Sequence, residues 1–289
     1  MNTTEQAEFD SLLPAARMGR RGFVATLAAT GFALATQPVM ASTVITTTDE
    51  GLDHGMIGIP SGDDVLPAYF ARPAGDRDLP VVLVVQEIFG VHEYIQDVCR
   101  RLAREGYLAI APELFFRQGD PSQIENVADI LSGIVSQVPD AQVMRDLDAC
   151  VAWAAEQNGA PERLAITGFC WGGRITWLYA AHNPSVKAGV AWYGRLDGAP
   201  ADNTPRHPID VAGELHAPVL GLYGGQDQGI PVEDVELMRE ELERASQPSE
   251  IVLYPDAPHA FHADYRPSYR ATEAADGWER LLDWFARHV

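Results

Sequence analysis

The stretch Gly168-Phe169-Cys170-Trp171-Gly172-Gly173 determines how the rest of this sequence is interpreted. It follows the apolar run Leu164–Thr167 and precedes residues 174–181, whose composition predicts a helix. A glycine on each side of the central residue permits a tight turn, because larger neighbours would clash with the strand before it and the helix after it. The pattern therefore predicts that Cys170 is presented on a sharp turn at the start of a helix.

This predicted position gives Cys170 the properties of a nucleophile. The positive end of a helix dipole favours a thiolate over a thiol. The backbone N–H of the next residue, Trp171, would face the oxyanion that forms when a carbonyl is attacked. The turn alone is equally compatible with a buried structural cysteine, so the remainder of the chain has to distinguish the two.

Two further side chains follow Cys170 in an informative order. Asp227 comes just after the apolar run Val219–Tyr223, and His259 lies on a loop after the run Glu250–Tyr254. The order of nucleophile, acid and histidine, each after a strand, is typical of hydrolases in which the histidine removes the nucleophile's proton. Separately, Asp227 could cap a turn and His259 could be a surface residue; together with the Cys170 turn they predict a catalytic triad.

An earlier loop adds a carboxylate and a backbone amide. The run Val81–Val85 ends in Gln86-Glu87-Ile88-Phe89-Gly90. The backbone N–H of Ile88 is the candidate for a second oxyanion donor, because the equivalent loop supplies it in hydrolases of this type. Glu87 would lie beside Cys170, where it could accept the thiol proton or disfavour the thiolate by like charge. The alternative is a solvated loop glutamate.

The alternation of elements predicts an α/β fold with a mostly parallel central sheet flanked by helices. Continuous apolar runs such as residues 81–85 suit strands that are buried on both faces. We expect helices over residues 141–156, 232–246 and 278–288. The expected strands are His54–Ile59, Val65–Arg72, Pro80–Gln86, Tyr107–Ala111, Arg163–Thr167, Ala188–Trp192, Ala217–Tyr223 and Glu250–Tyr254.

Composition excludes several classes of partner. The chain has 289 residues and a formal net charge of −20, which argues against nucleic acid or an anionic membrane as the partner. Its three cysteines cannot form a disulfide framework, and Cys99 and Cys150 are expected to be buried as small apolar residues. His262 lies three residues after His259, but no other ligand motif accompanies it. No metal or cofactor is expected.

The first 41 residues resemble an export leader. Arg20 and Arg21 precede a weakly apolar stretch, and small residues around Ala41 suit a cleavage site. Residues 1–41 are therefore expected to be a leader of the twin-arginine type, and residues 45–289 a single domain. The alternative is a tail with a chance pair of arginines. The leader predicts a periplasmic or exported protein, or a cytoplasmic one if the leader is not functional, without stable membrane insertion after its removal.

Together, these motifs resemble the dienelactone hydrolase (carboxymethylenebutenolidase) family, a single-domain α/β-hydrolase fold. The resemblance covers roughly residues 50–289 and rests on residues 86–90, residues 111–117, the elbow at 168–173, Asp227 and residues 259–261. It implies that Cys170 attacks a lactone carbonyl and forms an acyl-enzyme that water then cleaves. It also implies that His259 and Asp227 complete the triad, and that Glu87 pairs with the thiol at rest and takes part in its activation.

The resemblance implies arginines that bind a substrate carboxylate. Arg117 matches the first of them, and a guanidinium suits a planar carboxylate because it donates two parallel hydrogen bonds. The second arginine of the family falls on Ala263, a departure for which the nearby Arg266 could substitute. The alternative for Arg117 is an ordinary surface arginine. Because of the departure at Ala263, the sequence predicts hydrolysis of an ester or lactone but does not specify dienelactone as the substrate.

The sequence thus predicts a hydrolase that acts on a small ester or lactone through Cys170. The alternative is a periplasmic small-molecule-binding protein that keeps the fold without turnover, because fold by itself does not establish catalysis. A redox or acyl-transfer role for the thiol is a third possibility.

Overall fold

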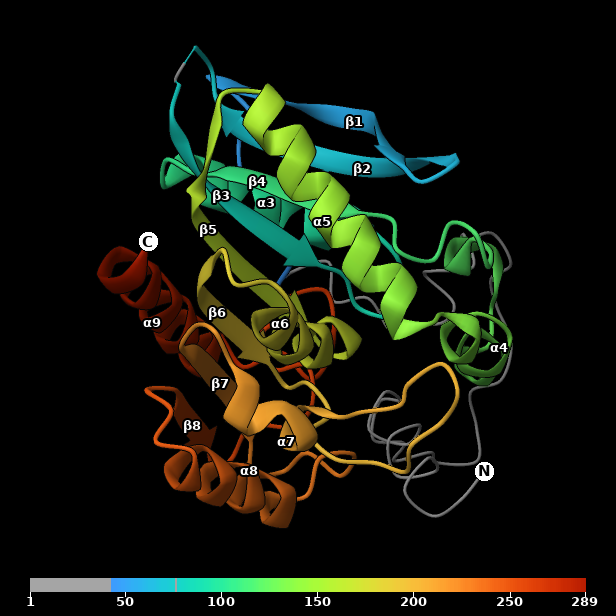
Figure 1. Cartoon of the computed structure of the whole chain (residues 1–289), viewed down its shortest axis with the longest axis vertical. Coiled ribbons are helices and arrows are strands. Elements are labelled where there is room, and N and C mark those ends of the chain that lie inside the picture. The colour runs from blue at the N-terminus through green and yellow to red at the C-terminus, as the bar shows by residue number, and fades with distance from the viewer. Residues whose placement is uncertain (1–42, 76) are drawn as a thin grey trace.

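A sheet of eight strands forms the centre of the molecule in the computed structural model, which describes residues 43–75 and 77–289 (Figure 1). The strand order is β1-β2-β4-β3-β5-β6-β7-β8. Strand β2 pairs antiparallel with β1 and with β4, and the remaining neighbours are parallel. The strands are β1 (Leu52–Ser61), β2 (Asp64–Pro73), β3 (Leu79–Val85), β4 (Leu108–Pro112), β5 (Gly159–Phe169), β6 (Val186–Trp192), β7 (Val219–Gly224) and β8 (Glu250–Tyr254).

Helices cover both faces of the sheet. Figure 1 shows α5 crossing the face of the sheet that is turned to the viewer, and α3 lies behind the sheet. The helices are α3 (Glu93–Arg104), α4 (Val127–Gly133), α5 (Asp140–Glu156), α6 (Trp171–His182), α7 (Pro208–Val211), α8 (Val232–Arg244) and α9 (Ala271–His288), with short 3₁₀ turns η1 (Pro121–Gln123), η2 (Val135–Gln137) and η3 (Ala212–Glu214). None of the helices described is long and apolar enough to cross a membrane.

Strand β3 shows how the apolar runs build this architecture. Its side chains alternate between two cores, since successive residues of a strand point to opposite faces. Val82 and Val84 belong to the core that contains α3 and α9, whereas Val81, Leu83 and Val85 belong to the core that contains α5 and parts of α6. Burial on both faces is the reason that this strand is a continuous apolar run.

The expected α/β fold with a mostly parallel sheet is confirmed, and each of the eight expected strands is present. Their ends differ: β5 begins at Gly159, four residues before the expected Arg163. Helix α9 begins at Ala271, earlier than the expected Trp278. The sequence did not predict its first turns because they bury only the small residues Ala274 and Gly277 and contain no repeat of large apolar residues. The expected leader, residues 1–41, lies outside the described residues, and the expected domain boundary at residue 45 stays a prediction.

Candidate active site

Cys170 lies on a strained turn between β5 and α6. Its backbone has φ 56° and ψ −116°, a left-handed conformation that costs free energy for a residue with a side chain. Its N–H donates a hydrogen bond to the Trp192 carbonyl at the end of β6, at 3.0 Å. The strained backbone is thereby anchored to the neighbouring strand, and the side chain stands at the carboxyl edge of the sheet.

The glycines around Cys170 are required by steric contact. A Cβ atom on Gly168 would lie 2.1 Å from the Gly172 carbonyl oxygen, and one on Gly172 would lie 2.4 Å from the Val85 carbonyl oxygen. Both neighbours are backbone atoms that cannot rotate away. The sequence-based reason for the Gly-x-Cys-x-Gly pattern, close packing of the strand against the helix, is therefore confirmed.

Asp227 and His259 reach this turn from two other loops. Asp227 follows β7, and its Oδ1 accepts a hydrogen bond from the Gly229 N–H at 2.9 Å, which orients the carboxylate. Its Oδ2 lies 2.6 Å from Nδ1 of His259, which follows β8. Both side chains are at least 95% buried. The structure thus brings together Cys170, His259 and Asp227, as the sequence predicted.

Charge interactions set the protonation of His259. Burial by itself lowers the pKa of this imidazole, but the Asp227 carboxylate and the Cys170 thiol raise it more, so the pKa lies well above its usual value. The other ring nitrogen, Nε2, is buried and is not engaged by Asp227, and the Cys170 thiol interacts with this imidazole. It is therefore available to exchange a proton with Cys170.

The two predicted oxyanion donors lie on adjoining segments. Trp171 is the first residue of α6, so its N–H has no acceptor within the helix. Ile88 is buried on the loop after β3. A Cβ on Gly172 would lie 2.6 Å from the Gln86 carbonyl oxygen, which shows that the loop of Ile88 packs against the first turn of α6.

Glu87 is fully buried and contacts groups other than the thiol. Its Oε2 accepts a hydrogen bond of 2.6 Å from the Tyr265 hydroxyl and lies 3.5 Å from Nε2 of His92. Among the described residues, no hydrogen bond joins Glu87 to Cys170. The expectation that Glu87 is a solvated residue is excluded, and the expected thiol contact is replaced by a contact with Tyr265, which sequence reasoning did not single out.

A cavity of about 640 Å³ opens beside Cys170. Trp171, Tyr193 and His259 line it together with Cys170. Three nitrogen-rich side chains form another part of its wall: Arg174, Arg195 and His207. The cavity is thus large enough for a small organic molecule, with the thiol on its wall. Within the described residues, no cluster of three or more histidine, cysteine or acidic side chains is placed to hold a metal ion.

The structure does not bring Arg117 to this cavity. Its guanidinium lies 2.7 Å from Asp146 and 2.6 Å from Asp64, and its central carbon lies 4.3 Å from the Phe116 ring centroid. Two carboxylates already satisfy this arginine, so the carboxylate-binding role expected for it has no support in the geometry.

Arg266 is also absent from the cavity wall. It is buried, with its guanidinium carbon 5.7 Å from the Phe89 ring centroid, and its charge lowers the pKa of Glu87. The arginines that do line the cavity, Arg174 and Arg195, were missed in the sequence. Arg174 directly follows the elbow and Arg195 comes three residues after β6 ends, so their position at the carboxyl edge of the sheet was the available signal.

The sheet order, the elbow after β5, the acid after β7 and the histidine after β8 define an α/β-hydrolase. Comparison with known proteins specifies the class further. A family model described as "Dienelactone hydrolase family" matches residues 66–289. The chain belongs to the dienelactone hydrolase family and is a hydrolase.

Individual relatives agree with this assignment. The chain is 59% identical over 287 residues, 99% of both chains, to a protein of Methylorubrum extorquens named "Putative carboxymethylenebutenolidase". It is 32% identical over 225 residues, 77% of this chain and 89% of the other, to a Bradyrhizobium protein named "Probable 2-oxo-3-(5-oxofuran-2-ylidene)propanoate lactonase". A Klebsiella pneumoniae crystal structure titled as a "Putative Dienelactone Hydrolase" superposes with a TM-score of 0.81 at 59% identity, covering 82% of this chain and 99% of that one.

Proposed function

We propose that the protein cleaves a small ester or lactone through a thiolate of Cys170 and an acyl-enzyme. The observation that carries this proposal is the contact of His259 with Asp227 at 2.6 Å, with the charge of Cys170 acting on the same imidazole. A buried carboxylate holds the imidazole in the orientation that accepts a proton from the nucleophile.

The steps follow from this arrangement. The imidazolium of His259 carries the proton given up by Cys170, and the thiolate sulfur attacks the carbonyl carbon to form a tetrahedral intermediate. The N–H groups of Ile88 and Trp171 donate to its oxyanion. The C–O bond to the alkoxide breaks, and His259 protonates the departing oxygen. A water molecule, deprotonated by His259, then attacks the thioester, which releases the acid and regenerates the thiol.

A lactone fits this chemistry as well as an open-chain ester. In a lactone the departing alkoxide stays attached to the acyl group, so ring opening leaves a hydroxy acid bound to Cys170 as a thioester. The names of two relatives, a carboxymethylenebutenolidase and a lactonase, support a lactone as the substrate class. The cavity of about 640 Å³ limits the substrate to a small molecule.

Replacement of the thiol tests the nucleophile. In a Cys170→Ala variant, we expect the kcat for lactones and activated esters to fall by at least about 10³-fold, because covalent catalysis is lost. Cys99→Ala, which removes a thiol buried in the core, is the control and should retain its kcat. Mass spectrometry of a rapidly quenched reaction should show an acyl adduct on Cys170. Unchanged turnover in Cys170→Ala would exclude the proposal.

We further propose that residues 1–41 direct export. Paired arginines before an apolar stretch support this proposal. Replacing Arg20 and Arg21 by lysine should retain the protein in the cytoplasm, as measured by cell fractionation. Equal periplasmic recovery of the variant and the natural sequence would contradict a twin-arginine leader.

A further inference from the structure

The connection between β4 and α5 adds an apolar wall to the cavity beside Cys170. The segment of α4 and η2 carries two sets of apolar side chains with the same spacing of i, i+3 and i+7, which places each set on one helical face. The first set is buried in the core: Val127, Ile130 and Ile134. The second set, called the α4–η2 wall below, is partly exposed and lines the cavity: Ala128, Leu131 and Val135.

We propose that the α4–η2 wall binds an aliphatic or aromatic acyl group of the substrate, so that the enzyme selects esters and lactones whose acyl group is apolar and uncharged. Apolar surface in a cavity is unfavourable in water, and a group that covers it gains free energy in proportion to the area removed from water. Trp171 and Ile230 add apolar surface to the same cavity. The proposal rests on the proposed function in taking Cys170 as the residue that carries the acyl group.

The order of the strands puts the α4–η2 wall and His259 on opposite sides of the nucleophile. Cys170 follows β5, and His259 follows β8, three positions along the sheet in one direction. The chain reaches α4 from β4, two positions along the sheet in the other direction. Figure 1 shows α4 and β8 on opposite sides of α6. The departing alkoxide lies beside His259, which protonates it, so the wall on the other side is left for the acyl group.

Hydrogen bonds hold both ends of the segment that carries the wall. At the start of α4, the side chain of Asn126 accepts a hydrogen bond from the Ala128 N–H at 2.8 Å. After η2, the Asn203 side chain donates to the Ser136 carbonyl at 3.0 Å, and the Asp140 N–H donates to the Asn203 carbonyl at 2.8 Å. A wall that is already ordered loses little conformational entropy when a ligand binds to it.

The cationic part of the cavity is already engaged by the protein. Both Nη atoms of Arg174 donate to the Asp140 carboxylate at 2.7 Å, and Nε of Arg195 donates to the Asp197 carbonyl at 3.0 Å. Burial and the charges of Arg174 and Arg195 lower the pKa of His207, so this imidazole is neutral at neutral pH. A carboxylate on the acyl group would in addition lose its hydration against the α4–η2 wall.

The test compares three esters of p-nitrophenol: the acetate, the hexanoate and the monoester of adipic acid, whose acyl chain is as long as hexanoate but ends in a carboxylate. Each methylene group removed from water contributes roughly a factor of four to binding. We therefore expect kcat/KM to be at least about 10-fold higher for the hexanoate than for either of the other two esters. An acetate or an adipate monoester that is cleaved as well as the hexanoate overturns the proposal.

Variants of the wall assign this preference to its residues. Leu131→Ser removes the largest side chain of the wall and should lower the ratio of hexanoate to acetate by about fivefold or more. Leu237→Ser is the matched control, because Leu237 is exposed on α8 and is not part of the described cavity wall, and it should keep the ratio. A ratio that stays in Leu131→Ser, or that falls equally in Leu237→Ser, overturns the proposal.

A second variant covers the case in which Leu131→Ser does not fold, as judged by circular dichroism. Val135→Thr keeps the shape of the side chain and adds a hydroxyl, so the ratio of hexanoate to acetate should fall in the same direction but by less. An unchanged ratio in folded Val135→Thr then counts against the proposal.

Alkylation of Cys170 separates this proposal from the proposed function. The thiolate displaces iodide from N-hexyl iodoacetamide, which forms a C–S bond, breaks the C–I bond and leaves the hexyl group in the cavity without hydrolysis. This reagent should modify Cys170 at least about fivefold faster than iodoacetamide, and Leu131→Ser should remove the difference. Cys170→Ala is the blank, and Cys99 and Cys150 have no exposed surface. Equal rates for the two reagents overturn the proposal, whereas a faster hexyl reagent in a protein that cleaves none of the esters contradicts the proposed function alone.

Discussion

The Asp227 carboxylate is the first of the groups that raise the pKa of His259, the proposed general base. The imidazole of His259 lies where burial favours its neutral form, and the contacts with Asp227 and Cys170 together reverse that preference. Its raised pKa keeps His259 protonated to a pH above its usual range. Such a histidine contributes stability that is fully present below the unfolded-state pKa, about 6.5, and is lost as the pH rises through the folded-state value.

Replacing Asp227 by asparagine should lower the pKa of His259. The Asp227 carboxylate is the first of the groups that raise this pKa, and without it the opposing effect of burial is less compensated, so we expect the pKa of His259 to be lower in Asp227→Asn than in the natural sequence. Nuclear magnetic resonance of the ring, assigned with a His259→Gln variant, measures this change. Asp256→Asn is the matched control, because this exposed aspartate lies three residues before His259 and is not among the groups that shift its pKa. An unchanged His259 titration in Asp227→Asn would contradict the assignment.

At the scale of the element, the strand–turn–helix unit of β5 and α6 depends on steric fit between backbone segments rather than on charge. The Cys170 turn closes only because backbone atoms approach where Gly168 and Gly172 lack a side chain. A methyl group at either glycine would clash with backbone carbonyl oxygens, and the clash could be relieved only if the strand or the helix moved. The positive φ of Cys170 is retained because both flanking elements are buried and fixed.

The Gly168→Ala variant should therefore lose at least about 3 kcal/mol of unfolding free energy. Gly133→Ala is the control: Gly133 ends α4, and a Cβ there meets no atom within 4 Å. This substitution should be neutral or stabilise the protein by up to about 1 kcal/mol. Urea denaturation monitored by tryptophan fluorescence compares the two. Similar stabilities would show that the predicted clash at Gly168 is relieved at little cost.

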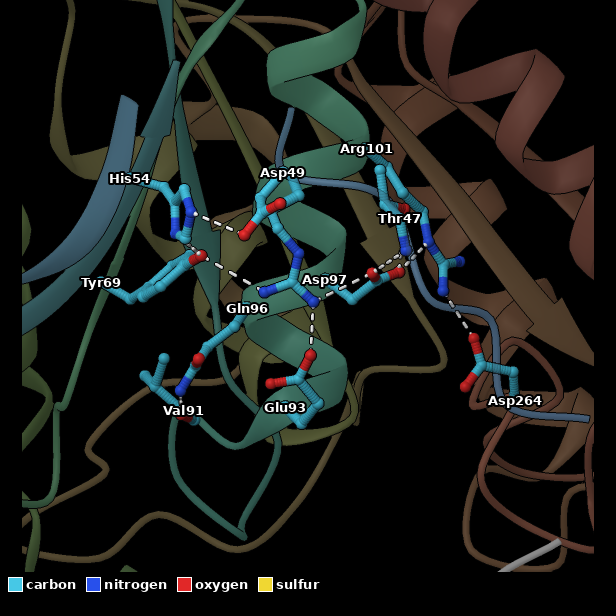
Figure 2. A network of polar contacts seen from close by, with 11 residues as sticks. Thr47, Asp49, His54, Tyr69, Val91, Glu93, Gln96, Asp97, Arg101 and Asp264 are labelled. Carbon is cyan, nitrogen blue, oxygen red and sulfur yellow. Dashed lines mark hydrogen bonds and ion pairs between the residues drawn. The ribbon is translucent and has the colours of Figure 1, made fainter. Parts of the chain in front are cut away.

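At the scale of the whole molecule, one buried ion-pair network joins segments that are far apart in sequence. Arg101 bridges Asp97 and Asp264, and Asp97 also holds the segment around Thr47 (Figure 2). Both carboxylates are almost fully buried, so the network links the segment before β1, helix α3 and the loop after His259 in a low-dielectric environment. Breaking such a network leaves charges buried without compensation.

Arg101→Met should consequently destabilise the protein by about 3 kcal/mol or more. Arg280→Met provides the contrast, because the Arg280–Asp276 pair on α9 is nearly half exposed on both sides, and exposed pairs contribute under about 1 kcal/mol. Thermal unfolding of both variants, with proteolysis of the segment before β1 as a second readout, measures the difference. Equal losses in the two variants would mean that the buried network is not a structural anchor.

The sequence was sufficient to predict the class of fold and the placement of Cys170, Asp227 and His259, for a physical reason. Strands buried on both faces are continuous apolar runs, and the carboxyl ends of parallel strands meet at one edge of the sheet. Residues that directly follow such runs are therefore brought together whatever the details of packing. The glycines of the elbow are equally local, since the turn itself requires them.

Only the tertiary structure decided which polar side chains meet. Arg117 is neutralised by Asp146 and Asp64, 29 and 53 positions away, and Glu87 is bound by Tyr265, 178 positions away. The cavity wall uses Arg174 and Arg195 instead of Arg117 and Arg266. No local pattern encodes such contacts, because long side chains select their partners by the distance and burial that the assembled fold creates.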